Sequence, residues 1–151
     1  RRRSAVRLVF LDSSSFFSAV NSPSGGSAKL FTLKDLKLVA STLVLTEVER
    51  NIREKLESYH LERFFILVNQ LEIISIVPNQ DQIKQARKVT AEKDAPILAS
   101  FLTSKAHFLV TLDKKHFLVE SVEEFIKPKK IVTPKTLIQQ GSQRLGCVGL
   151  A

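Results

Sequence analysis

The sequence lacks the features of several common classes of small protein. It has one cysteine, Cys147, so no intrachain disulfide can form, which fits a reducing compartment. It has no methionine, not even an initiator, which predicts a processed or trimmed N-terminus. No stretch approaches the ~18 uninterrupted apolar residues of a membrane span, and the first residues do not form a secretory signal. We therefore expect a cytoplasmic protein without a membrane partner.

Several chemical motifs are also missing. No GxGxxG follows the first predicted strand and no GxxxxGK[ST] occurs, which excludes the usual nucleotide-phosphate loops. No CxxC or HExxH occurs, and His60, His107 and His116 show no metal-ligand spacing. These absences argue against the common zinc and nucleotide sites.

The composition is that of a basic globular domain. The chain has 151 residues, about one domain, and 44% of them are hydrophobic, enough for a real core. We expect a single domain over 1–151, with its core at about 6–138 and peripheral ends. Lys and Arg number 23 against 15 Asp and Glu, which gives a net charge of +8. This charge favours a polyanion such as nucleic acid as partner, although it can also serve solubility alone.

Short apolar segments alternate with helical patterns along the chain. This alternation predicts an α/β fold with a parallel sheet covered on both faces. The segment 21–27 is expected to be a loop, 28–36 has helical spacing, and the apolar helix over 60–71 is expected to be well buried. Strands are predicted over 6–11, 37–41, 72–77, 107–112 and 130–133, and further helices over 42–59, 82–90, 95–106, 121–127 and 134–140.

Two predicted strands end in an aspartate. Asp12 follows the apolar run 8–11, and Asp113 follows the strand that begins at His107. In an open α/β sheet, ligands bind outside the carboxyl ends of the strands. Both carboxylates should therefore lie on the edge of the sheet where ligands bind.

Two further acids are expected at this edge. Asp94 stands at the N-cap position of the helix predicted over 95–105. That helix should run roughly 16 Å from the edge at ~1.5 Å per residue. The next strand should return roughly 16 Å at ~3.3 Å per residue, which brings Asp94 level with Asp113. Glu47 lies in the second turn of the helix after the strand 37–41, and it flanks the apolar stripe of that helix.

Each acid also has a structural interpretation. Asp12 and Asp94 could cap helices. Asp113 could be a turn aspartate, and Glu47 could pair with Arg50. Four carboxylates at one place repel one another, however, so their convergence predicts a bound cation. Oxygen ligands favour Mg²⁺ or Mn²⁺ over zinc, and such an ion suits phosphodiester hydrolysis.

Four segments carry a resemblance to a known family. VFLDSSSF, LTEVERNI, DAPILASFL and LVTLDKKHF resemble, in order and spacing, the four motifs of the PIN domain, and in particular the toxin nucleases of the VapC kind. The resemblance extends from about 6 to about 138, and its most specific parts are 94–99 and 111–113. It implies a three-layer α/β/α sandwich with a central parallel sheet.

The resemblance also implies an activity and a set of site residues. It implies a Mg²⁺- or Mn²⁺-dependent ribonuclease that cleaves RNA to 5′-phosphate and 3′-hydroxyl ends. Ser13 and Thr111 would support the site by hydrogen bonding. A small DNA-binding antitoxin and a homodimer are the further partners that this family suggests. The implied catalytic and metal-binding quartet is Asp12, Glu47, Asp94 and Asp113.

The basic residues and two rival functions stay open. A solvated basic face is the alternative to phosphate contact for the lysines. One rival function is a catalytically silent PIN-fold module that binds RNA or protein. The other is a phosphatase, which would ordinarily carry an Asp-x-Asp where this chain has Ser14 as the second acid. The candidate phosphate contacts are Lys114, Lys115, Lys127, Lys129 and Lys130.

Overall fold

The computed structural model describes residues 6–140, so Cys147 and the N-terminal residues 1–5, with their basic run 1–3, lie outside it. Its strands are all parallel and form one sheet in the order β3-β2-β1-β4-β5. Because the strands are parallel, their carboxyl ends share one edge. The strands are β1 (Arg7–Leu11), β2 (Leu36–Ser41), β3 (Glu72–Ile74), β4 (Phe108–Val110) and β5 (Lys130–Val132).

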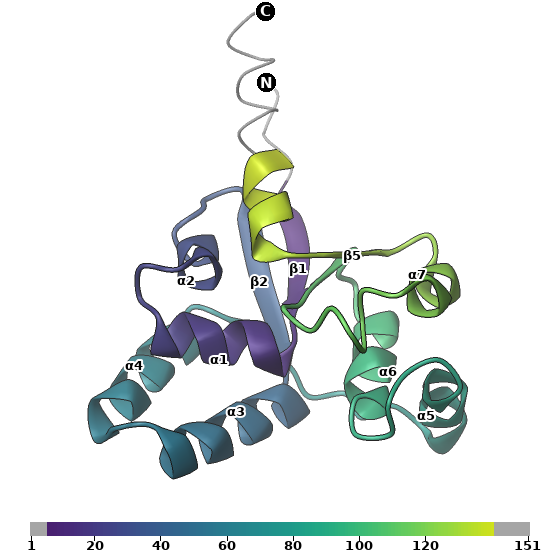
Figure 1. Ribbon diagram of the computed structural model, residues 1–151, viewed down its shortest axis with the longest axis horizontal. Coiled ribbons are helices and arrows are strands. Elements are labelled where there is room, and N and C mark those ends of the chain that lie inside the picture. Colours follow the sequence, from purple (N-terminus) through teal and green to yellow (C-terminus); the bar gives the residue numbers. More distant parts are fainter. Residues whose placement is uncertain (1–5, 141–151) are drawn as a thin grey trace, which may run out of the picture.

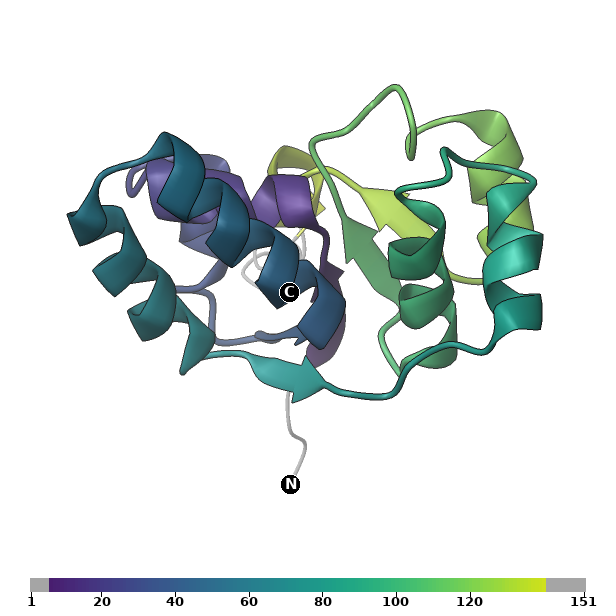
Figure 2. The ribbon, with the colours of Figure 1, turned by 90° about the horizontal axis from the view of Figure 1, so that it is seen from below.

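The helices form two groups, one on each side of the sheet. Figure 1 shows α1–α4 to the left of the strands and α5–α7 to the right, and Figure 2 shows the same two groups from below. This arrangement confirms the predicted α/β/α sandwich with a parallel sheet. The helices are α1 (Ser13–Asn21), α2 (Gly26–Leu30), α3 (Thr42–Lys55), α4 (Ser58–Val68), α5 (Gln80–Arg87), α6 (Ala95–Thr103) and α7 (Glu120–Ile126), followed by a helix over 134–140.

Strand β1 occupies the centre of the sheet, and its sequence explains why. Val9, Phe10 and Leu11 are buried, as expected for a strand covered by helices on both faces. Phe10 aligns with Val39 of β2. The backbone N–H that follows the strand, that of Asp12, donates to the Val110 carbonyl at 3.2 Å. The end of β1 is thus tied to the end of β4.

Helix α3 forms as its pattern predicts. Val44, Val48 and Ile52 are its buried residues, so the apolar stripe faces the core. The Ser41 hydroxyl caps the helix by accepting from the Val44 N–H at 3.2 Å. On the outer face, Arg53 pairs with Glu49 at 2.9 Å. These contacts fix the face of α3 that meets the carboxyl edge.

The segment 21–36 corrects the prediction made for it. Helix α1 ends at Asn21, and α2 begins at Gly26, inside the predicted loop. α2 ends at Leu30, and the chain turns before Leu36 enters β2. The leucine spacing resembles that of one helix, yet the leucines belong to a helix, a turn and a strand. Apolar spacing alone does not distinguish one continuous helix from a helix, a turn and a strand in succession.

Helix α4 is less buried than expected. Only Phe64 and Leu67 are buried, whereas Tyr59, Phe65 and Ile66 are exposed. The helix lies at the edge of its layer against α1 and α3, so one face alone is covered. No helix among residues 6–140 combines the length and apolar composition needed to span a membrane.

Candidate active site

All four predicted acids line one pocket at the carboxyl edge of the sheet. Asp12 follows β1, Glu47 is on α3, Asp94 precedes α6 and Asp113 follows β4. The pocket measures about 210 Å³. Its lining consists of Asp12, Ser13, Ser14, Phe17, Glu47, Asn51, Lys93, Asp94, Ile97, Asp113 and Phe117.

Asp12 is both a helix cap and a pocket residue. It is 2% exposed, and its Oδ1 accepts from the Ser15 backbone N–H at 2.9 Å at the start of α1. The Ser14 and Ser15 hydroxyls also donate to Oδ1, each at 2.9 Å. The Thr111 hydroxyl donates to Oδ2 at 2.5 Å. Burial raises the pKa of the Asp12 carboxyl, although these hydrogen bonds counteract it.

Glu47 is held toward the pocket by a neighbouring helix. The Ser13 hydroxyl of α1 donates to Oε1 of Glu47 at 2.5 Å. Within the described part of the chain Glu47 forms no ion pair with Arg50, so that structural interpretation of Glu47 is wrong. Ser13 and Thr111 therefore each donate a hydrogen bond to one of the acids, and their role in supporting the site stays a prediction.

Asp94 occupies the N-cap position of α6 without acting as a cap. Its side chain makes no capping hydrogen bond, and the residue is only 8% exposed. Within residues 6–140, its Oδ2 is buried and has no hydrogen-bond partner. Burial raises the pKa of this carboxyl, and the negative charge of Asp113 adds to the effect. A bound proton or cation would offset the cost of burying this oxygen.

Asp113 is bound by His116, three residues further along the chain. The His116 backbone N–H donates to Oδ1 at 3.0 Å, and its ring Nδ1 lies 3.0 Å from Oδ2. Burial acts to raise the pKa of Asp113, but the hydrogen bonds and charge of His116 take it below its usual value. Asp113 thus also serves as a turn aspartate. Like Asp12, it accepts from the backbone N–H three residues further along the chain.

His116 is the functional candidate that the sequence reasoning missed. Its Nδ1 also lies 4.0 Å from Oδ2 of Asp94. One ligand atom each of Asp94, Asp113 and His116 lies within 4.8 Å of the other two. The spacing Asp113-x-x-His116 was the available signal, because it places both side chains on one side of a helical turn.

The donor set fits a divalent cation. It offers carboxylate oxygens and one imidazole nitrogen. Among the described residues, the buried Oδ2 atom of Asp94 has no hydrogen-bond donor, and a cation could take that place. Glu47 and Asp113 both raise the pKa of Asp94, which shows that the three carboxylates interact. A cation between them would offset this repulsion. The residues present therefore suit a metal ion at this edge.

Two more polar pocket residues were not singled out from the sequence. Asn51 lies one turn after Glu47 on α3, and Lys93 directly precedes Asp94. The charge of Lys93 lowers the pKa of Asp94, against the larger effect of burial. The i,i+4 spacing and the chain adjacency were the signals that could have identified them.

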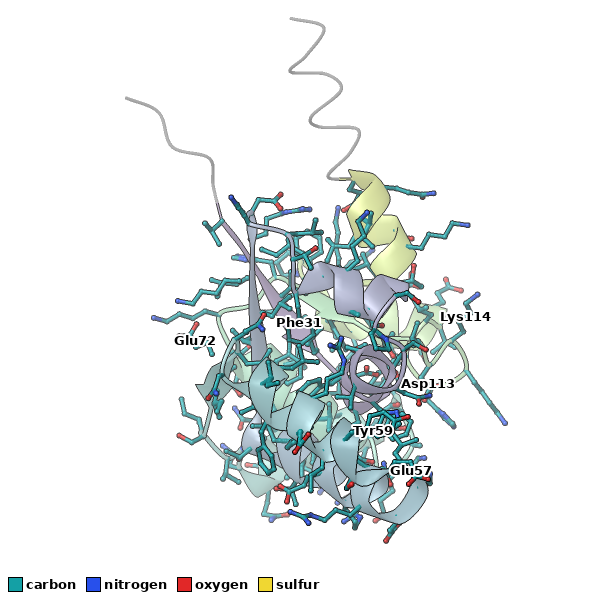
Figure 3. The ribbon with its side chains drawn as sticks, turned by 90° about the vertical axis from the view of Figure 1, so that its left-hand side faces the viewer. Phe31, Glu57, Tyr59, Glu72, Asp113 and Lys114 are labelled. Atoms are coloured by element: carbon teal, nitrogen blue, oxygen red, sulfur yellow. The ribbon has the colours of Figure 1, made fainter. Side chains whose placement is uncertain are left out.

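The candidate phosphate-binding lysines divide between the two edges of the sheet. Lys114 and Lys115 are exposed and directly follow Asp113, and Figure 3 shows Lys114 next to Asp113. Lys130 begins β5 and is aligned with Phe108, the first residue of β4. Lys130 therefore belongs to the amino edge, away from the pocket.

The other two lysines near Lys130 are engaged within the fold. Lys127 pairs with Glu124 at 2.7 Å. Lys129 Nζ donates to the carbonyls of Phe101 and Ser104, at 3.1 and 2.7 Å, and burial lowers its pKa. A phosphate contact by Lys127, Lys129 or Lys130 remains a prediction, and it has no support from this geometry.

Several solved structures share this fold. A chain of VapBC2 from Rickettsia felis, in a complex bound to a promoter DNA fragment, is 18% identical with a TM-score of 0.65, over 83% of this chain and 98% of that chain. The DNA-bound VapBC of Salmonella typhimurium is 18% identical with a TM-score of 0.56, over 85% and 98%. VapC20 of Mycobacterium tuberculosis, described as a sarcin-ricin loop cleaving toxin, is 15% identical with a TM-score of 0.52, over 71% and 91%.

The sequence comparisons give the family itself. No curated protein sequence matches this chain at a significant level. The family model of the PIN domain matches residues 9–120, which is more than half of the chain. That match contains all four pocket acids, the strands β2, β3 and β4, and the last three residues of β1. The chain therefore belongs to the PIN domain family.

Proposed function

We propose that this protein is a metal-dependent endoribonuclease that hydrolyses RNA phosphodiester bonds. One observation carries the proposal: acids from four separate segments line one pocket, and a buried oxygen of one of them, Asp94, lacks a partner. Membership of the PIN domain family supports it, as does the fold shared with VapC20, which is described as a sarcin-ricin loop cleaving toxin.

The residues of the pocket suggest a division of roles. Asp94 and Asp113 would hold a Mg²⁺ or Mn²⁺ ion, which when bound lowers the pKa of water and neutralises charge on the phosphate. Glu47 accepts from Ser13 through Oε1, which leaves its Oε2 to take a proton from the attacking water. Asp12 is fixed by its donors and would orient the ion or its hydration shell.

The surroundings of the pocket suit a polyanionic substrate. Lys114 and Lys115 are exposed beside Asp113, and the chain carries a net charge of +8. Lysines next to a carboxylate site can contact the phosphates that flank the scissile bond. We therefore assign the phosphate contacts to Lys114 and Lys115.

We further propose that a small DNA-binding protein is the partner and inhibitor of this nuclease. The Rickettsia felis and Salmonella typhimurium structures that share its fold are VapBC complexes with DNA. The test is to co-express the chain with any small protein encoded by the adjacent gene. A stable copurifying complex with reduced ribonuclease activity is expected. A neighbour that neither binds nor inhibits would contradict this part of the proposal.

The ribonuclease activity is tested with the purified chain and a panel of structured RNAs. With Mn²⁺ or Mg²⁺ we expect cleavage that leaves 5′-phosphate and 3′-hydroxyl ends, and no cleavage with EDTA. Asp113→Asn should abolish it. Asp81→Asn makes the same chemical change on the exposed face of α5 and serves as the matched control, with cleavage unchanged. Cleavage that survives EDTA would contradict a metal-dependent mechanism.

One observation favours a second candidate, a catalytically silent module that binds RNA. The Asp12 carboxylate already accepts from Ser14, Ser15 and Thr111, so it is stable without a metal ion. If Asp12 is only a cap, the pocket need not bind an ion tightly. Tight RNA binding with no measurable Mn²⁺ affinity and no cleavage across the panel would establish this candidate.

A further inference from the structure

His116 places an imidazole nitrogen among the carboxylates of the pocket. Its Nδ1 lies 3.0 Å from Oδ2 of Asp113 and 4.0 Å from Oδ2 of Asp94. The four acids that the family resemblance implies do not include a nitrogen ligand. The choice of metal ion at this site therefore depends on whether the His116 ring is itself a ligand.

The two separations suit atoms that share one small cation. Ligands at about 2.0–2.1 Å from an octahedral ion lie about 3 Å apart when adjacent and about 4 Å apart when opposite. The distances from Nδ1 to Asp113 and Asp94 lie in this range. Each of these two separations is one that two ligands of the same ion can have.

The condition of the two carboxylates supports the same conclusion. Asp94 is 8% exposed, and within the described residues its Oδ2, which faces His116, has no hydrogen-bond partner. Asp113 accepts from the His116 backbone N–H, and its Oδ2 lies 3.0 Å from the ring Nδ1, an atom that donates or accepts according to the tautomer. If Nδ1 carries the lone pair and Nε2 the proton, Asp113 keeps the backbone hydrogen bond and Nδ1 can bind a metal.

We propose that His116 is a metal ligand through Nδ1 and that it makes this site prefer Mn²⁺ over Mg²⁺. This inference rests on the proposed metal-dependent nuclease. Imidazole suits transition-metal ions, whereas Mg²⁺ takes carboxylate, carbonyl and water oxygens. A site of carboxylates alone would separate the two ions less. His116 is therefore the residue that determines metal specificity.

The test measures metal binding directly and does not depend on cleavage. Affinities for Mn²⁺ and for Mg²⁺ are measured by calorimetry on the full chain and on His116→Ala, His116→Asn and His107→Ala. His107 is exposed at the amino edge, so His107→Ala is the matched control. In His116→Ala we expect Mn²⁺ affinity to fall at least ~10-fold and Mg²⁺ affinity to change less than about 3-fold.

The Asn variant and spectroscopy separate a ligand from a positioning residue. Asn can still donate to Asp113 but is a poor substitute for an imidazole ligand, so His116→Asn should lose Mn²⁺ affinity like His116→Ala. Pulsed electron paramagnetic resonance of Mn²⁺ bound to the wild type should show coupling to a histidine nitrogen, a signature absent from both variants. This measurement on the wild type decides the question even if a variant fails to fold.

Each other outcome has a defined meaning. Equal loss of both ions in His116→Ala, restored in His116→Asn, would overturn the inference and make His116 a positioning residue for Asp113. Unchanged Mn²⁺ affinity in both variants, or no nitrogen coupling, would also overturn it while the proposed function stands. A wild-type chain that binds neither ion would overturn the proposed function together with this inference.

Discussion

The two ends of helix α6 lie next to side chains of opposite charge, and the two side chains differ in how many hydrogen bonds they make. Asp94 lies at its N-terminus and Lys129 contacts its C-terminus, so each charge has the sign that the helix dipole favours. Lys129 donates to two carbonyls at that end and lies 4.9 Å from the centroid of the Phe101 ring. Among the described residues, Oδ2 of Asp94 has no hydrogen-bond partner.

This difference suggests that the C-terminal end of α6 contributes to stability and that its N-terminal end contributes to function. At the amino edge the chain satisfies its own groups, because the last carbonyls of α6 receive hydrogen bonds from Lys129. At the carboxyl edge, among the described residues, the buried Oδ2 atom of Asp94 has no hydrogen-bond partner. We therefore expect substitutions at the two ends to affect different measurements.

The largest expected effect is on cleavage. Asp94→Asn should slow RNA cleavage about 1,000-fold, because a metal ion contributes several kcal/mol of transition-state stabilisation and each ~1.4 kcal/mol is tenfold in rate. Lys129→Ala should leave the rate within about 3-fold when both are assayed below their unfolding temperatures. Single-turnover cleavage of one RNA by both variants checks this. Equal losses in the two variants would contradict the conclusion that only the N-terminal end of α6 takes part in cleavage.

The second effect is on stability, and here the substitution of Lys129 should have the larger effect. Lys129→Ala should lower the free energy of unfolding by about 1–2 kcal/mol, since two carbonyls of α6 lose their donor and a cation–π contact is lost. The matched control is Lys127→Ala, which removes the exposed ion pair with Glu124 and should cost less than about 0.5 kcal/mol. Urea denaturation measures both values. A neutral Lys129→Ala would show that the capping contacts contribute little.

The third prediction concerns Asp94 without metal. Asp94→Asn should leave the free energy of unfolding equal or raise it by up to about 1 kcal/mol after chelator treatment, because it removes a buried charge. Adding Mn²⁺ should then raise the unfolding temperature of the wild type more than that of the variant. A clear loss of metal-free stability in Asp94→Asn would favour a structural role for this residue.

The same variant should change how stability depends on pH. Burial raises the pKa of Asp94 in the folded chain above its ordinary value of 3.8, so the folded state binds the proton more readily. Metal-free wild-type stability should therefore fall as pH rises through the interval between the two pKa values. The advantage of Asp94→Asn should be largest at neutral pH and vanish near about pH 4, which thermal unfolding across this range measures.

The smallest expected effect is on RNA affinity. Lys114→Ala, beside the pocket, should weaken binding a few-fold across all RNA sequences and reduce the salt slope by about 1. Lys130→Ala, at the amino edge, should leave both unchanged. The measurement is fluorescence anisotropy at several salt concentrations in the presence of EDTA. If Lys130 carries the larger effect, RNA binds at the amino edge and the assignment of its phosphates to Lys114 and Lys115 is wrong.

The sequence was informative where one constraint dominated. The apolar run before Asp12 predicted a central strand because burial on both faces tolerates no polar residue there. Matching lengths of the helix and strand between Asp94 and Asp113 predicted that both would reach the same edge. The segment around Leu33 was mispredicted because helical spacing arose there from three different elements.

The sheet, its parallel direction and the edge at which the acids gather could all be predicted from the sequence alone. These follow from hydrophobic periodicity and chain length, which are local properties of the polypeptide. Three features could be seen only in the folded chain. Asp12 has several hydrogen-bond donors whereas Oδ2 of Asp94 has none among the described residues, His116 lies beside Asp94 and Asp113, and Lys129 donates to the end of α6. Hydrogen bonds and burial depend on segments far apart in the chain: Thr111 reaches Asp12, and Lys129 reaches Phe101, only because parallel strands bring them together.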